Sequence, residues 1–184
     1  MKTRYSPLNQ ALHWITALCM FAILPLAWVM INAKAGSDIQ HGTYNWHKTL
    51  GCIVLLVTVF RIGWRFVDGP PPYTARVAAW DRHLAHLVYW LFFAIMIWMP
   101  VTGFMESAYD GYPIALFNLI QTPEIFPKND DIAHLYASLH RLGVWPVYGL
   151  IVLHLVGVVF HLVFARDGVL GRMLPAQALD ADGE

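Results

Sequence analysis

The stretch LHRLGVWPVYGLIVLHLVGVVFHLVF (residues 139–164) decides the fold of this chain. It is 26 residues long and predominantly apolar. An α-helix needs about 20 such residues to cross a hydrocarbon core of about 30 Å. Lipid offers no hydrogen-bond partners, so a backbone that crosses it must satisfy its own amides within the segment. The stretch therefore predicts a membrane-spanning α-helix.

Three more apolar stretches of similar length precede it, at about residues 8–31, 46–66 and 84–104. The chain is 58% hydrophobic and only 13% charged, whereas a soluble domain is about 25% charged. The pattern predicts an all-α membrane protein whose single domain, residues 1–184, is a four-helix transmembrane bundle. The first stretch is longer than the apolar region of a signal peptide, about 7–15 residues, so we expect it to be retained.

The charges and cysteines exclude two classes of protein. Lys+Arg and Asp+Glu number 12 each, so the chain lacks the basic surplus that a nucleic-acid binder needs. Its two cysteines, Cys19 and Cys52, lie inside apolar stretches and form no CxxC motif. They are typical of small buried apolar residues rather than of a disulfide framework.

Basic residues predict the orientation of the bundle. Eight of the 12 lie at the end that holds both termini and the loop 69–81, and four lie at the other end. Cytoplasmic loops carry the excess of Lys and Arg, so we expect both termini in the cytoplasm and the segments 33–45 and 105–138 outside. Within the outer segment, the apolar piece 114–120 predicts a short helix at the membrane interface.

The spacing of histidines in the fourth stretch predicts two binding levels. His140 and His154 are fourteen residues apart, which is almost four turns, so both project from nearly one face about 21 Å apart. His47, at the outer end of the second stretch, matches the depth of His140. His13, in the inner half of the first stretch, matches His154. His161, seven residues further along the same face, suits His13 nearly as well, and spacing leaves this choice open.

The chemistry that suits such pairs is haem binding. Bundles often hold metal cofactors with side chains that project inward from several helices, and polar groups inside membranes are costly and usually functional. Two imidazoles fill both axial positions of haem iron, which is typical of electron transfer. The chain has no CxxCH motif, so we expect two non-covalent haems of the b type.

Other histidines, small residues and basic residues allow two interpretations. His41 and His134 fall in predicted outer loops, and His83 and His86 begin the third stretch; a structural or solvent-exposed role explains these four equally well. Gly51, Gly143 and Gly157 follow ligand candidates by three or four residues, where a flat macrocycle or a neighbouring helix approaches the backbone.

Arginines at helix ends are candidates for pairing with haem propionates, or serve only as orientation signals. These are Arg61, Arg65 and Arg82 on the inner side and Arg141 on the outer side.

The sequence resembles the prokaryotic cytochrome b561 family of small dihaem membrane proteins. The matching motifs are Leu12-His13-Trp14, Trp46-His47-Lys48 with Gly51, Arg82-His83-Leu84-Ala85-His86, Leu139-His140-Arg141-Leu142-Gly143 and the tail Asp167–Pro175. The resemblance implies that His13 and His154 bind the cytoplasmic-side haem, and that His47 and His140 bind the periplasmic-side haem.

The same resemblance implies an oxidoreductase of the inner membrane that takes an electron from superoxide and passes it to ubiquinone. On this model, His161 binds the quinone, with His86 and Arg82 nearby. The long outer connection carries five acids against one lysine, which would repel an anionic donor. An alternative is therefore a membrane anchor subunit that accepts electrons from a periplasmic redox protein. A third interpretation is a haem-free fragment of a transporter.

Overall fold

The computed structural model describes residues 3–73, 77–112, 114–117 and 119–175. Four helices dominate it: α1 (Pro7–Asn32), α2 (Asp38–Asp68), α3 (Ala79–Tyr109) and α4 (Asp130–Phe160). Each is long and apolar enough to cross a membrane. The four predicted helices are confirmed, and the chain is a helical membrane protein.

The outer helix ends extend beyond the apolar stretches. α2 begins eight residues before the predicted start at 46, and α4 begins nine residues before 139. The side chains of Ser37 and Asn129 cap these helices by accepting hydrogen bonds from backbone amides, which satisfies donors that the first turn leaves free. The extra turns are polar because they lie outside the apolar span. His41 and His134 consequently lie on helices, and the prediction that they fall in loops is wrong.

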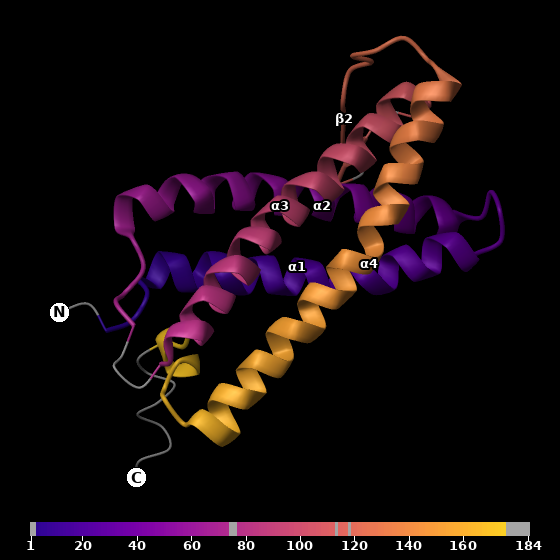
Figure 1. Cartoon of the computed structure of the whole chain (residues 1–184). Coiled ribbons are helices and arrows are strands. Elements are labelled where there is room, and N and C mark those ends of the chain that lie inside the picture. Colours follow the sequence, from indigo (N-terminus) through magenta and orange to yellow (C-terminus); the bar gives the residue numbers. More distant parts are fainter. Residues whose placement is uncertain (1–2, 74–76, 113, 118, 176–184) are drawn as a thin grey trace.

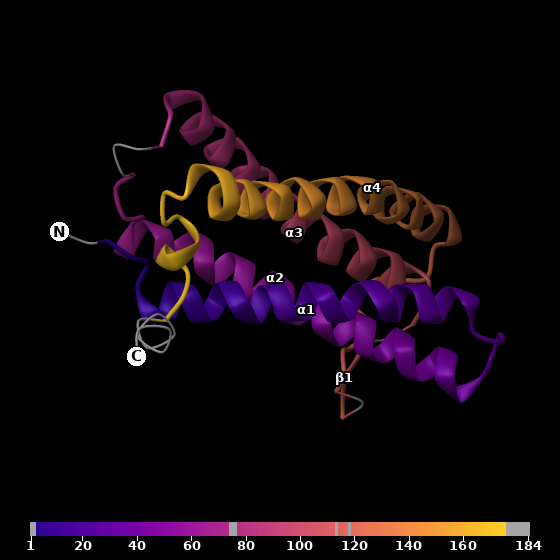
Figure 2. The ribbon, with the colours of Figure 1, turned by 90° about the horizontal axis from the view of Figure 1, so that it is seen from below.

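The helices form two layers that cross each other (Figure 1). α1 packs along α2 in one layer, and α3 packs along α4 in the other, as the view from below also shows (Figure 2). A small cluster of buried apolar side chains, Val54 of α2 with Phe93 and Met96 of α3, joins the layers. Most other large apolar side chains of the helices face outward, as expected for a bundle that lipid surrounds.

The outer connection contains a hairpin instead of the predicted helix at 114–120. Strand β1 (Ala115–Leu116) pairs in antiparallel fashion with β2 (Ile120–Gln121), and the hairpin projects from the bundle beside α2 (Figure 2). Phe117 has a φ of 52°, a left-handed conformation that a helix does not contain. Its N–H donates to the Thr49 hydroxyl over 3.1 Å. This bond to α2 holds the turn in place.

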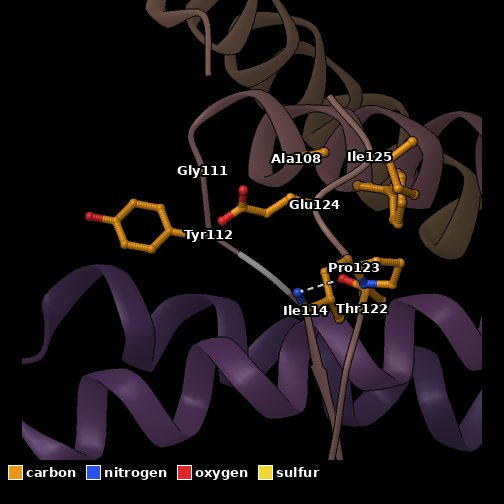
Figure 3. Close-up of a pocket in the computed structure, with 9 residues that line it drawn as sticks. Ala108, Gly111, Tyr112, Ile114, Thr122, Pro123, Glu124 and Ile125 are labelled. Carbon is orange, nitrogen blue, oxygen red and sulfur yellow. Dashed lines mark hydrogen bonds between the residues drawn. The ribbon is translucent and has the colours of Figure 1, made fainter. Parts of the chain in front are cut away.

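A small pocket lies beneath the same connection. The Ile114 N–H donates to the Thr122 hydroxyl over 3.0 Å at its edge, and the Glu124 side chain points toward Tyr112 across it (Figure 3). Its volume is about 20 Å³, which holds roughly one water molecule. This pocket is too small to bind a substrate.

The inner end gathers the first residues, the α2–α3 loop and the C-terminal segment. After α4 the chain forms a π-helical turn, η1 (His161–Ala165), and a 3-10 turn, η2 (Leu170–Arg172). The Tyr5 N–H donates to the Arg172 carbonyl over 3.2 Å. The Arg172 guanidinium donates to the carbonyls of Pro71 and Pro72 over 2.6 and 2.9 Å. Both ends of the described chain thus lie on one side of the bundle.

Arg172 is expected to stabilise this end. Alanine at this position removes two charge-assisted hydrogen bonds from a side chain that is only 8% exposed, so the free energy of unfolding should fall by about 2–4 kcal/mol. Arg172→Lys keeps the charge but not the forked donor, and should recover less than half of the loss. Thermal unfolding of the purified protein in detergent measures both variants. Equal midpoints for Arg172→Ala and the wild type would contradict the prediction.

Candidate functional site

The outer histidine pair faces across the two layers. His47 of α2 and His140 of α4 have ring centres 6.2 Å apart, with the ring planes at 79°. An imidazole nitrogen binds a transition metal at roughly 2.0–2.1 Å and lies about 1.1 Å from its ring centre, so two coaxial rings on one metal have centres about 6.3 Å apart. The spacing of this pair therefore fits a single metal atom between the two rings.

The backbone of α3 orients the His140 ring. His140 Nδ1 lies 2.9 Å from the Met99 carbonyl and 3.2 Å from the Thr102 hydroxyl. Because the carbonyl only accepts, Nδ1 carries the proton and Nε2 has a free lone pair. Metal-binding histidines commonly donate their other N–H to such a carbonyl. Gly103 makes room for the ring, since a Cβ there would lie 3.1 Å from His140 Cε1.

The His47 ring also fits a ligand role. Its Nδ1 is buried and has no hydrogen-bond partner within the residues that the structure describes, although the Ile23 backbone of α1 lies beside the ring. Buried polar atoms without a partner are rare in proteins. Such an atom is expected where a bound group supplies the missing interaction.

The inner pair repeats the outer arrangement. His13 of α1 and His154 of α4 have ring centres 6.2 Å apart and planes at 60°. Phe92 of α3 contacts the His154 ring edge-on at 5.6 Å. The structure thus brings His154, not His161, against His13. α4 contributes one member to each pair, at levels about 21 Å apart along its axis.

One of the four arginines proposed for propionates lies at the inner pair, and a second lies one turn away on the same helix. Arg61 of α2 donates to the Thr16 hydroxyl of α1 over 3.3 Å and is close enough to His13 for an electrostatic interaction. Arg65, one turn further along α2, stacks over the Tyr89 ring of α3 at 4.2 Å. Both guanidinium groups thus contact a neighbouring helix, where carboxylates of a bound macrocycle could reach them.

The other two arginines have different surroundings. Arg82 donates from Nε to the Val77 carbonyl over 3.1 Å, which ties it to the loop before its own helix. Arg141 is exposed and donates to Ser138 of the same helix over 3.4 Å. Arg141 is still close enough to His140 for an electrostatic interaction. A second cation, Lys48, lies beside His47, and its Nζ donates to the Ser107 hydroxyl over 2.6 Å.

The glycines divide between the two roles that the sequence left open. Gly143 packs against α3, because a Cβ there would collide with Met99 Sδ, so close helix contact explains it. At Gly51 and Gly157, a Cβ would have no neighbouring atom within 4 Å among the described residues. Open space at these two positions suits a flat macrocycle against the helix.

A third cluster surrounds His161 at the inner end. His161 Nδ1 lies 2.7 Å from an Asp167 carboxylate oxygen, and Nε2 lies 3.5 Å from one of Asp81. The side chains of His161 and Asp81 are each 14% exposed, and that of Asp167 is 2% exposed. The sequence reasoning missed both carboxylates, since no motif links the start of α3 to the turn after α4. His86, predicted near His161, is exposed and lies beside Tyr73 instead.

A cavity of about 700 Å³ adjoins this cluster. Its wall includes His161 and Asp167, the apolar side chains of Leu162 and Leu170, and the basic side chain of Arg4. Binding sites for small organic molecules have this size and this mixture of apolar surface with a few polar groups. The cavity begins two turns beyond His154, close to the inner pair.

Comparison with known proteins gives a consistent result. A family model described as prokaryotic cytochrome b561 matches residues 4–176. The chain is 30% identical to cytochrome b561 homolog 2 of Escherichia coli (strain K12), over 96% of this chain and 94% of the relative. It is 26% identical to the probable superoxide oxidase CybB of Yersinia pestis, over 95% and 98%. Cytochrome b561 homolog 1 of Escherichia coli (strain K12) is 27% identical, over 94% and 97%.

Proposed function

The chain belongs to the prokaryotic cytochrome b561 family, and from that premise we propose that it passes single electrons from a periplasmic donor through two b-type haems to ubiquinone. Membership makes it a membrane electron-transfer protein with b-type haem in the bacterial inner membrane. The number of haems, the donor and the acceptor belong to the proposal.

The two equivalent histidine pairs carry this proposal. Both have ring centres 6.2 Å apart, and they lie at two levels of the same helix. His47 and His140 hold the outer haem, and His13 and His154 hold the inner haem. A bound haem supplies one-electron chemistry, and its potential depends on the axial ligands, their hydrogen bonds and burial.

The residues around each pair position the haem and balance its charge. The Met99 carbonyl fixes the His140 ring through Nδ1, which makes Nε2 a stronger ligand. Arg61 and Arg65 supply positive charge for the propionates of the inner haem. Lys48 supplies the corresponding charge beside the outer haem.

Ubiquinone is the proposed acceptor, in the cavity beside His161. Its headgroup is a small ring with two carbonyl oxygens, for which apolar walls and a histidine N–H are suitable partners. The cavity adjoins the inner haem site, so an electron from that haem has a short path to it. Arg82 follows Asp81 in the first turn of α3, but neither Arg82 nor His86 lines the cavity.

Superoxide is the leading donor because a relative is named a probable superoxide oxidase. Mixing the oxidised protein with superoxide in a stopped-flow instrument should reduce haem and then form ubiquinol. The acidic outer surface, Glu106, Asp110, Glu124, Asp130 and Asp131, repels an anion at long range. The rate of haem reduction should therefore rise as the ionic strength increases from about 10 mM to about 150 mM.

The same acidic surface favours a second candidate, a membrane anchor that receives electrons from a basic periplasmic redox protein. Opposite charges would steer that partner, so its rate of haem reduction should fall with ionic strength. No haem reduction by superoxide, together with fast reduction by a basic redox protein, would overturn the first candidate. Absence of any b-type absorption bands in the purified protein would overturn both.

A further inference from the structure

Three residues at the inner end form a connected chain of proton-carrying groups. Asp81 lies in the first turn of α3, His161 begins the π-helical turn η1 directly after α4, and Asp167 follows that turn. The imidazole lies between the two carboxylates, with Nε2 3.5 Å from Asp81 and Nδ1 2.7 Å from Asp167. The backbone also fixes Asp167, whose second oxygen accepts from the Val169 N–H over 3.1 Å.

The His161 ring can hold either one or two protons between the carboxylates of Asp81 and Asp167. A neutral imidazole carries one N–H and a cationic imidazole carries two. The short contact between Nδ1 and Asp167 takes one N–H. The second nitrogen, Nε2, then faces the Asp81 carboxylate. These two acceptors can form a hydrogen bond only when a further proton lies between them. The geometry therefore provides a place at which an additional proton is taken up and released.

The two carboxylates face different surroundings. Asp81 is 14% exposed and does not line the cavity, whereas Asp167 is 2% exposed and lines it together with His161. A proton from water can reach Asp81, cross the imidazole from Nε2 to Nδ1, and arrive at the cavity wall. The basic groups on the cavity wall, Arg4, Arg166 and Arg172, do not accept protons near neutral pH.

We propose that Asp81, His161 and Asp167 form a proton relay from the cytoplasmic surface to the cavity, an inference that rests on the proposed reduction of ubiquinone there. Conversion of a quinone to a quinol consumes two electrons and two protons. The electrons arrive one at a time from the inner haem. The donor reacts at the outer side of the membrane and therefore supplies no proton to the cavity. Both protons enter from water through Asp81, and each one forms an O–H bond on a quinone oxygen.

The test uses the haem-loaded protein with Asp81→Asn or Asp167→Asn. Asparagine keeps the size and a hydrogen-bond acceptor, but it cannot carry a proton. We expect the rate of haem reduction to be unchanged, ubiquinol formation to fall at least about tenfold at pH 8, and reduced haem to accumulate. Because protons must then come directly from water, the remaining rate should fall about tenfold for each unit of pH. The wild type should vary much less.

Two controls separate a relay from a structural effect. Asp38→Asn changes an exposed carboxylate at the outer end of the bundle and should leave ubiquinol formation and its pH profile unchanged. Imidazole buffer, a small mobile proton carrier, should restore much of the lost rate in Asp81→Asn. Equal rates and pH profiles for Asp81→Asn and the wild type would overturn the relay. If the wild type itself formed no ubiquinol, the proposed function would fail instead.

Discussion

Replacing His140 with alanine should remove one haem from each chain and leave the other. The two histidine pairs share no residue, and the ring centres within each pair lie 6.2 Å apart. Loss of one axial imidazole removes one of the two iron bonds expected at this site, which should weaken haem binding enough for the haem to be lost on purification. The haem content measured by pyridine haemochrome analysis should therefore fall from two haems to one per chain. His47→Ala should give the same value.

The matched control for this experiment is His134→Ala. His134 lies on the same helix, is exposed, and belongs to neither pair, so both haems should remain. The double variant His47→Ala with His140→Ala should also keep one haem, because the inner pair is intact. Two haems in His140→Ala would contradict the assignment of the outer pair. Complete loss of haem would show that the two sites do not form independently.

Replacing His154 and His161 with alanine, one at a time, should separate haem binding from quinone reduction. His154→Ala should lose the inner haem, since its ring faces His13. His161→Ala should keep both haems, because its ring contacts Asp167 rather than His13. Without the imidazole, ubiquinol formation should slow by about 100-fold, within the range of general acid–base effects. Haem content and stopped-flow ubiquinol formation measure the two outcomes.

The opposite pattern would contradict this division. Loss of one haem in His161→Ala, with both retained in His154→Ala, would make His161 the inner ligand. His83→Ala is a suitable control, because this exposed residue near the start of α3 contacts neither pair in the described part of the chain. It should keep two haems and the wild-type rate of ubiquinol formation.

The sequence predicted the four helices and the depths of the histidines because both depend on local regularities. A membrane span requires an apolar stretch of fixed length, and fourteen residues on a helix return to one face. The same regularity left His154 and His161 equivalent, because both lie on that face. The structure distinguishes their positions through the π-helical turn, which begins at His161 and places Asp167 beside its ring.

The features that the sequence did not predict depend on long-range contacts or on short polar turns. Apolar composition suggested a helix at 114–120, but the bond from Phe117 to Thr49 of α2 holds a hairpin there. Asp81 and Asp167 meet only because α3 begins where α4 ends. Periodicity within one segment contains no information about such pairs.

The crossing of the two layers has a consequence for how the protein is assembled. Both histidine pairs join the α1–α2 layer to α4, while the apolar cluster of Val54, Phe93 and Met96 between the layers is small. Under the proposed assignment, each haem would therefore cross-link the two helical hairpins. Maturation of this cytochrome is thus expected to follow the supply of haem: a starved cell would accumulate loosely joined halves, which proteases in the membrane could recognise and remove.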